Sequence, residues 1–205
     1  MSDAAEEKFR AFIAIRIGSK ALERVHRIQR SLGDRLSSGA VQWAAPGHIH
    51  LTLQFLGNVP TDSLGPLELA LRDACGKTSP FGLGTGGLGC FPNDRAPRIL
   101  WVGLRGDLEA LADLQRSIAE KVVPFIERAE SRPFHPHLTI GRIKHPDRKT
   151  TRLLGRLIKE VKLPSVEEWQ VQEVELIKSE ISALGAIHTP LHRIRLSNQD
   201  GCDPP

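Results

Sequence analysis

The chain has 205 residues, of which 40% are hydrophobic and 25% charged, an ordinary composition for a globular domain. This length suits one domain, or two small lobes that share a core. The formal net charge of +4 is compatible with a phosphate-bearing partner. The three cysteines include no Cys-x-x-Cys pair, which argues against a disulfide framework or a cysteine zinc site.

Hydrophobic periodicity predicts alternating strands and helices along the chain. In the first half, we expect strands at 9–17, 41–43 and 49–56, a helix at 19–36 capped by Ser19, and a helix from Thr61 or Asp62 to Ala74. We expect the glycine-rich segment 81–91 to be irregular. In the second half, we expect a strand at 99–104, a helix capped by Asp107 and running to about residue 128, a strand at 137–143, a helix at 150–159, and extended segments at 166–181 and 186–196. These elements predict an α+β fold in which each half repeats a strand–helix–strand–helix order.

The chain contains no apolar run of the length that crosses a bilayer. The first eight residues lack the basic-then-apolar order of a signal peptide. We therefore expect a cytoplasmic monomer with no membrane partner. A single domain is predicted over 1–197, followed by a disordered tail at 198–205.

A short motif, His-x-Thr-x, occurs twice, at 50–53 (HLTL) and at 137–140 (HLTI). Each copy lies inside a predicted strand and is followed by a glycine. Random placement of the eight histidines and the eight threonines would give fewer than one His-x-Thr. A single histidine on a half-buried strand is most often structural, but two copies in matching contexts indicate a function.

The spacing of the motif explains its chemistry. Residues i and i+2 of a strand point to the same face, so His50 and Thr52 share one side, as do His137 and Thr139. Two adjacent strands would then bring together two imidazoles and two hydroxyls. In hydrolysis of a cyclic phosphodiester, one neutral histidine takes a proton from water and one protonated histidine gives a proton to the departing ribose oxygen. This chemistry needs no metal and no cofactor.

The segments 50–57 (HLTLQFLG) and 135–142 (HPHLTIGR) resemble the paired signatures of the 2H phosphoesterases. The nearest branch is the bacterial and archaeal RNA 2′,3′-cyclic phosphodiesterases, once called 2′–5′ RNA ligases. The resemblance extends from about residue 9 to residue 196. It also includes the segments 43–46 (WAAP), 87–92 (GLGCFP), 98–103 (RILWVG) and 176–179 (LIKS).

This resemblance implies two pseudo-symmetric lobes, each an antiparallel sheet with outer helices, which enclose a central cleft. It implies an RNA 2′,3′-cyclic phosphate end as substrate, from tRNA fragments for example, and opening of the ring to a 2′-phosphate. His50 would be the proton donor and His137 the proton acceptor, while Thr52 and Thr139 would hold the phosphate. The motif itself is symmetric and does not distinguish the two roles.

The roles of two further residues, Arg142 and His188, cannot be read from the motif alone. Arg142 is a candidate phosphate or base contact by the resemblance, but a regular strand would point it away from His137, so the strand must twist or end at Gly141. A tyrosine is common in the family near the last strand. This chain contains no tyrosine, and His188 stands at about that place.

Other interpretations of the same residues stay open. The pairs His48/His50 and His135/His137 could in principle bind zinc. The segment 84–89 (GTGGLG) fits a dinucleotide-binding fingerprint, but a loop follows it where a helix is needed. A basic cluster at 142–152 could line an RNA path or form a solvated helix face. Alternative functions are hydrolysis of a small cyclic nucleotide or an ADP-ribose cyclic phosphate, and RNA-end binding without turnover. Joining of ends through a 2′–5′ bond, by the reverse reaction, could be a side activity of the leading function.

Overall fold

A computed structural model describes residues 7–127, 132–144, 147–160, 168–182 and 185–197. Its strands are β1 (Lys8–Arg16), β2 (Val41–Trp43), β3 (His50–Pro60), β4 (Phe81–Phe91), β5 (Ile99–Gly106), β6 (His137–Ile143), β7 (Glu168–Val171), β8 (Glu173–Ser182) and β9 (Gly185–Arg195). Its α-helices are α1 (Ser19–Gly33), α2 (Leu64–Cys75), α3 (Leu108–Lys121) and α4 (Arg148–Glu160). The predicted α+β fold is confirmed. The expected tail at 198–205 lies outside the described residues.

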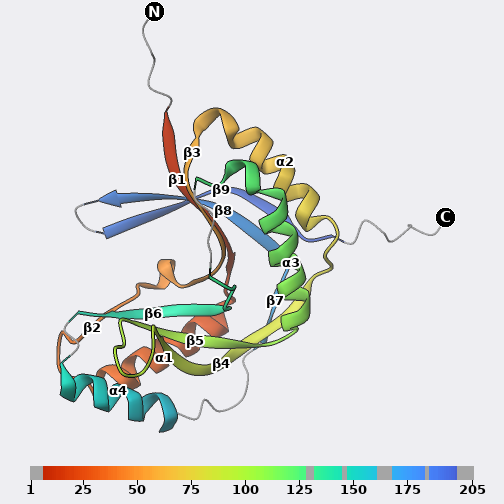
Figure 1. Ribbon diagram of the computed structural model, residues 1–205. Helices are drawn as coiled ribbons and strands as arrows, with labels where there is room; N and C mark the ends of the chain where they lie inside the picture. Colours follow the sequence, from red (N-terminus) through yellow and green to blue (C-terminus); the bar gives the residue numbers. More distant parts are fainter. Residues whose placement is uncertain (1–6, 128–131, 145–146, 161–167, 183–184, 198–205) are drawn as a thin grey trace, which may run out of the picture.

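The described strands form one nine-stranded antiparallel sheet in the order β7-β4-β5-β6-β3-β1-β8-β9, with β2 paired to β6. The order is symmetric about its centre: β3 corresponds to β6, β1 to β5, β8 to β4 and β9 to β7. The first lobe contains β1, β3, β8 and β9, and the second lobe contains β2 and β4 to β7. The two halves join where β3 pairs with β6 at the centre of the sheet (Figure 1).

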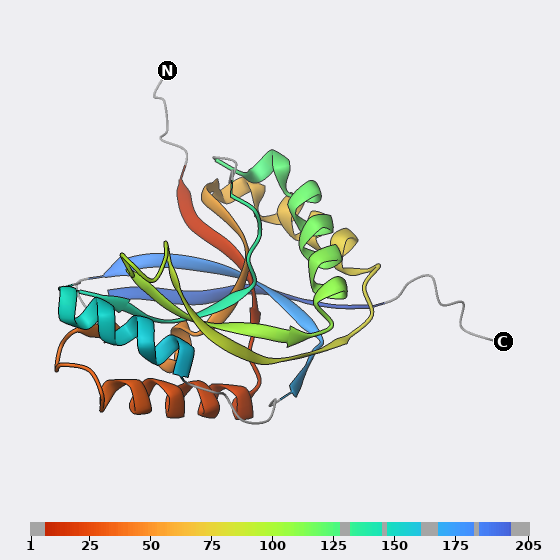
Figure 2. The same ribbon diagram turned by 60° about the horizontal axis from the view of Figure 1, so that its bottom comes forward.

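Two helices cover each lobe, and the lobes exchange one helix. α2 and α3 pack together over the first lobe, where α3 contacts β3 (Figures 1 and 2). α1 and α4 cover the second lobe, where α1 contacts β6 and β7. Since α1 follows β1 of the first lobe and α3 follows β5 of the second, each helix crosses to the other half. The exchange ties both halves into one hydrophobic core, which includes Leu51, Leu138 and Ile140.

Two predictions about helix ends differ from the structure, and one is confirmed. Ser19 does not cap α1, because Gly18 occupies the N-cap position and no side chain caps the helix. The third helix ends at Lys121 instead of near residue 128, since a short 3₁₀ turn follows that contains Pro124, which cannot donate a backbone hydrogen bond. Asp107 does cap α3, as predicted, by accepting a hydrogen bond from Ala110 N at 3.0 Å.

The glycine-rich segment, predicted to be irregular, forms the regular strand β4, with a bulge between Thr85 and Leu88. One of its glycines, Gly89, makes room for a neighbouring aromatic ring. A Cβ at Gly89 would overlap the indole of Trp101, so only glycine fits beneath that ring. In the part of the chain that is described, no helix is long and apolar enough to span a membrane.

Candidate active site

The pairing of β3 with β6 brings the two motifs together. Leu51 pairs with Leu138, and both side chains are fully buried in the core. The residues on either side of each leucine therefore point to the opposite face of the sheet. We call this surface the histidine face; its central residues are His50, Thr52, His137 and Thr139.

The antiparallel register relates the two motifs by a pseudo-twofold axis through the central leucine pair. With Leu51 opposite Leu138, the register places His50 across from Thr139 and Thr52 across from His137. Cross-strand neighbours have Cβ atoms about 5 Å apart. Each hydroxyl is thus beside the imidazole of the other motif as well as near its own. The arrangement offers a phosphate donors from both strands.

A β-bulge follows each motif at the same position. In β3, Ala14 pairs with Thr52 and Ile13 with Gln54, so Leu53 is the extra residue. Since a bulge reverses the alternation of a strand, Gln54 is buried and Phe55 lies on the histidine face, with 57% of its surface exposed.

The bulge in β6 has the same effect on Arg142. Leu100 pairs with Gly141 and Trp101 with Thr139, which makes Ile140 the extra residue. Arg142 is exposed and shares the histidine face with Thr139. The strand does not end at Gly141; it changes its alternation there, and a Cβ at Gly141 would lie 2.7 Å from Val41 Cγ1. Arg142 is therefore available as a phosphate contact.

A glutamine from the exchanged helix holds each bulge from the core side. Gln29 of α1 donates from Nε2 to the carbonyl of Ile140 at 2.9 Å and to that of Ala44 at 2.9 Å. Gln115 of α3 donates to the carbonyl of Leu53 at 3.4 Å. Ile140 and Leu53 are the extra residues of the two bulges. The helix exchange therefore supports the site from behind in both lobes.

His50 is packed among aromatic rings. It stacks on Phe12 with ring centroids 4.8 Å apart and an interplanar angle of 25°. The ring of His188 lies edge-on to His50 at 5.4 Å and contacts His48 at 4.7 Å. Phe12 is buried, but it belongs to a small cluster with Ala14 and Ile177 that is separate from the main core. Phe12 therefore backs the histidine instead of filling the core.

His137 is fixed by a hydrogen bond to the backbone. Its Nδ1 lies 2.6 Å from the carbonyl oxygen of His135. A carbonyl can only accept, so Nδ1 must carry the proton and Nε2 of the neutral ring keeps its lone pair. Phe91 packs edge-on against the ring at 5.0 Å, and Trp101 lies 6.2 Å away. His137 is thus prepared to accept a proton through Nε2.

The surroundings of both histidines favour the neutral imidazole. Burial lowers the pKa of His50 from 6.5 to about 4, with further contributions from the charges of His188, His48 and Arg16. Burial also lowers the pKa of His137, partly opposed by its hydrogen bond to His135. In the free protein, both rings are therefore neutral at pH 7.

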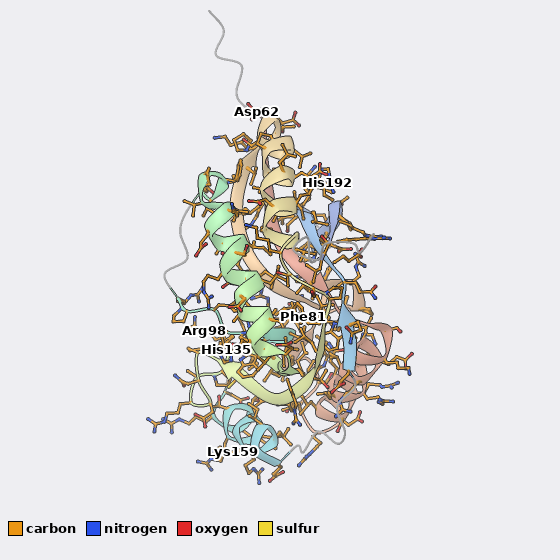
Figure 3. All side chains as sticks on the ribbon, turned by 90° about the vertical axis from the view of Figure 1, so that its right-hand side faces the viewer. Asp62, Phe81, Arg98, His135, Lys159 and His192 are labelled. Atoms are coloured by element: carbon orange, nitrogen blue, oxygen red, sulfur yellow. The ribbon has the colours of Figure 1, made fainter. Side chains whose placement is uncertain are left out.

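Two further histidines, His192 and His26, are not among the contacts of the motif histidines, and the described residues do not support a zinc site. His192 lies on the helix side of the sheet, where its Nδ1 is 3.1 Å from Glu68 of α2 (Figure 3). His26 is on α1. No group of three histidines, cysteines or carboxylates with the geometry to hold a metal ion occurs among the described residues.

Sequence patterns missed several residues of the histidine face. Phe55, Phe91 and Trp101 come from three different strands. The segments of Phe91 and Trp101 were part of the family resemblance, but no pattern in them placed either ring beside a motif histidine. Aligning the two motif copies would have found Phe55, because it occupies the position in HLTLQF that Arg142 occupies in HLTIGR. The contacts of His188 could be found only from the fold.

A family model described as the 2′-5′ RNA ligase superfamily matches residues 9–181 of the chain. The chain belongs to this superfamily. The resemblance seen in the doubled motif is thereby confirmed, and the match covers both motifs.

Two curated relatives named RNA 2′,3′-cyclic phosphodiesterase align over most of the chain. The protein of Methanothermobacter thermautotrophicus is 35% identical, and the alignment spans 92% of this chain and 100% of that protein. The protein of Aquifex aeolicus is 30% identical, with 97% of its length covered by 91% of this chain.

Two solved structures are similar in fold. The Thermus thermophilus protein TT0787 superposes with a TM-score of 0.74 at 24% identity, over 93% of this chain and 99% of that one. Escherichia coli LigT complexed with 3′-AMP superposes with a TM-score of 0.72 at 24% identity, with the same coverage of 93% and 99%. These structures support the two-lobed α+β fold.

Proposed function

We propose that the protein is a metal-independent RNA 2′,3′-cyclic phosphodiesterase that opens the cyclic phosphate at an RNA terminus and leaves a 2′-phosphate. The observation that carries this proposal is the pairing of Leu51 with Leu138, which gathers two imidazoles and two hydroxyls on one face. The superfamily match and the names of the two relatives support the same reaction.

In the proposed reaction, Thr52 and Thr139 donate hydrogen bonds to the phosphate oxygens. Nε2 of His137 takes a proton from water as the water oxygen attacks phosphorus. The bond from phosphorus to the ribose O3′ breaks, and His50 gives its proton to O3′. One proton is gained by His137 and one lost by His50, and exchange with solvent restores both rings.

Because the pKa of His50 is low, the proposed scheme requires the bound substrate to promote protonation of this histidine. A proton donor must be charged, and His50 is neutral in the free protein at pH 7. The cyclic phosphate carries one negative charge, which raises the pKa of an adjacent imidazole. Substrate binding therefore prepares the acid, and productive complexes form by uptake of a proton.

Two exposed side chains of the histidine face could contact parts of the substrate other than the cyclic phosphate. Phe55 offers an aromatic surface on which a base can stack. Arg142 offers a guanidinium for a phosphate oxygen or a base edge. The same groups could join ends through a 2′–5′ bond if the 5′-hydroxyl of a second RNA, in place of water, lost its proton to His137 and attacked phosphorus, with O3′ again leaving and taking a proton from His50.

The test is product analysis with a short RNA that ends in a 2′,3′-cyclic phosphate, in the presence of a chelator. We expect a 2′-phosphate terminus. His50→Ala and His137→Ala should each abolish turnover, while His192→Ala, which removes a histidine from the helix side, should retain it. An untouched RNA would refute the proposal and favour a small cyclic phosphate or binding alone.

A further inference from the structure

A buried carboxylate on the histidine face holds two arginines. The side chain of Glu175 in β8 is 2% exposed. Arg16 of β1 binds it with Nε at 3.1 Å and Nη2 at 2.9 Å, and Arg193 of β9 binds it with Nε at 3.0 Å. The arginine side chains are 56% and 59% exposed. One carboxylate balances only one guanidinium, so the cluster keeps a net positive charge at the surface.

The strand register connects this cluster to the motif. Arg16 pairs with His50, and Ala14 pairs with Thr52 on one side and with Glu175 on the other. Glu175 in turn pairs with Arg193. From Thr52 to Arg193 there are three inter-strand spacings, about 14 Å in all. The two arginines therefore lie at increasing distance from the phosphate site, along a line across β1, β8 and β9.

Both arginines keep donors for a ligand. A guanidinium has five N–H groups in a fixed fork that fits phosphate oxygens. Glu175 occupies only Nε of Arg193, and Nε and Nη2 of Arg16; the other nitrogens contact no acceptor in the described part of the chain. The buried carboxylate fixes both forks in advance. Arg193 also lines a hollow of about 400 Å³ together with Arg195 of β9 and Arg72 of α2.

We propose that Arg16 and Arg193 bind backbone phosphates of the RNA upstream of its cyclic end, so that the enzyme prefers oligonucleotides to cyclic mononucleotides. This inference rests on the proposed function and adds a path for the RNA strand across the protein surface. The RNA runs from the motif across β1 and β8 to the edge strand β9. Arg16 meets the first upstream phosphate and Arg193 a later one.

The experiment compares kcat/KM on three substrates: a 2′,3′-cyclic mononucleotide, a trinucleotide with a 2′,3′-cyclic phosphate end, and the same trinucleotide with uncharged methylphosphonate linkages. Wild type should prefer the charged trinucleotide and lose this preference with the uncharged one. Arg193→Gln is the test variant, because Arg16 also influences His50. Glu175 keeps its pair with Arg16 in this variant.

Arg193→Gln should lower the ratio of trinucleotide to mononucleotide kcat/KM by roughly threefold to tenfold, as expected for one exposed charge-assisted contact. Its kcat/KM on the charged trinucleotide should also fall less steeply with salt, with the log–log slope smaller by about 0.7. Arg193→Lys should recover part of the ratio, since it restores the charge without the fork. Arg116→Gln is the matched control, because Arg116 pairs with Asp113 on α3 and should leave the ratio unchanged.

The outcomes separate this inference from the proposed function. If wild type hydrolyses all three substrates equally well, or if Arg193→Gln keeps the wild-type ratio, the phosphate path is wrong while the activity stands. If wild type leaves all three substrates intact, the proposed function itself fails. Methylphosphonate linkages that reduce the rate of Arg193→Gln as much as that of wild type would also overturn the assignment of Arg193.

Discussion

Replacement of Gln29 by methionine tests the support behind the second motif. Gln29 is 8% exposed, and its amide binds the carbonyls of Ala44 and Ile140. Methionine has a similar volume but no polar group. Ile140 would keep one partner, the N–H of Ala44 at 3.0 Å, while the carbonyl of Ala44 would lose the amide that binds it. A partly buried acceptor that loses its partner costs about 1–3 kcal/mol, so we expect a loss of about 2 kcal/mol.

Urea unfolding measures this loss. With an m value of about 2 kcal/mol/M, the unfolding midpoint should fall by about 1 M. Gln115→Met is the matched control in the other lobe, where the half-buried amide makes one long bond of 3.4 Å to Leu53, and its loss should be below about 1 kcal/mol. Equal losses in the two variants, or none at Gln29, would refute the reasoning.

The same variant should also affect substrate binding. Ile140 is the extra residue of the bulge that puts Arg142 on the histidine face. A bulge that relaxes without Gln29 would move that guanidinium while leaving His137 and Thr139, which precede it, in place. We therefore expect Gln29→Met to raise KM more than it lowers kcat, and a fall in kcat alone would contradict this role.

Three further predictions follow from the site. In the proposed mechanism the free enzyme acts with His50 protonated and His137 neutral. Because burial lowers the pKa of both histidines below 6.5, kcat/KM should be highest below pH 6.5 and should fall as the pH rises above it; a pH–rate profile with both limbs above pH 7 would exclude the assignment. Gly89→Ala places a Cβ against the indole of Trp101 and should destabilise the protein by about 1–3 kcal/mol in urea, whereas Gly87→Ala, which meets nothing within 4 Å, should cost less than half as much. Turnover should persist in a chelator, because the described residues hold no cluster suited to a metal, and loss of activity restored by added zinc would contradict this.

The common face of the histidine and the threonine in each motif could be predicted from the sequence, because it depends only on the alternation of side chains along a strand. Alternation places residues two apart on one face, so the pairs of His50 with Thr52 and of His137 with Thr139 need no knowledge of neighbouring strands. Helix periodicity likewise located four helices, and errors were confined to their ends, as at Ser19.

The bulges could not be predicted in the same way. A bulge is defined by the partner strand, and the partners of β3 and β6 come from β1 and β5, distant in sequence. The alternation rule therefore placed Arg142 on the wrong face and gave no role to Phe55. The ion pairs of Glu175 are equally non-local, since they join β8 to β1 and β9.

The two motifs are nearly identical in sequence, yet the fold makes their histidines different. His137 donates its Nδ1 proton to the carbonyl of His135, a contact that the chain supplies two residues earlier and that fixes one tautomer. His50 has the equivalent His48, but that residue turns toward His188. The rings around His50 make its protonated form costly until an anion arrives. In the proposed mechanism, residues outside the motif therefore decide which histidine is the base and which is the acid, so exchanging the roles would require exchanging these surroundings and not the motifs.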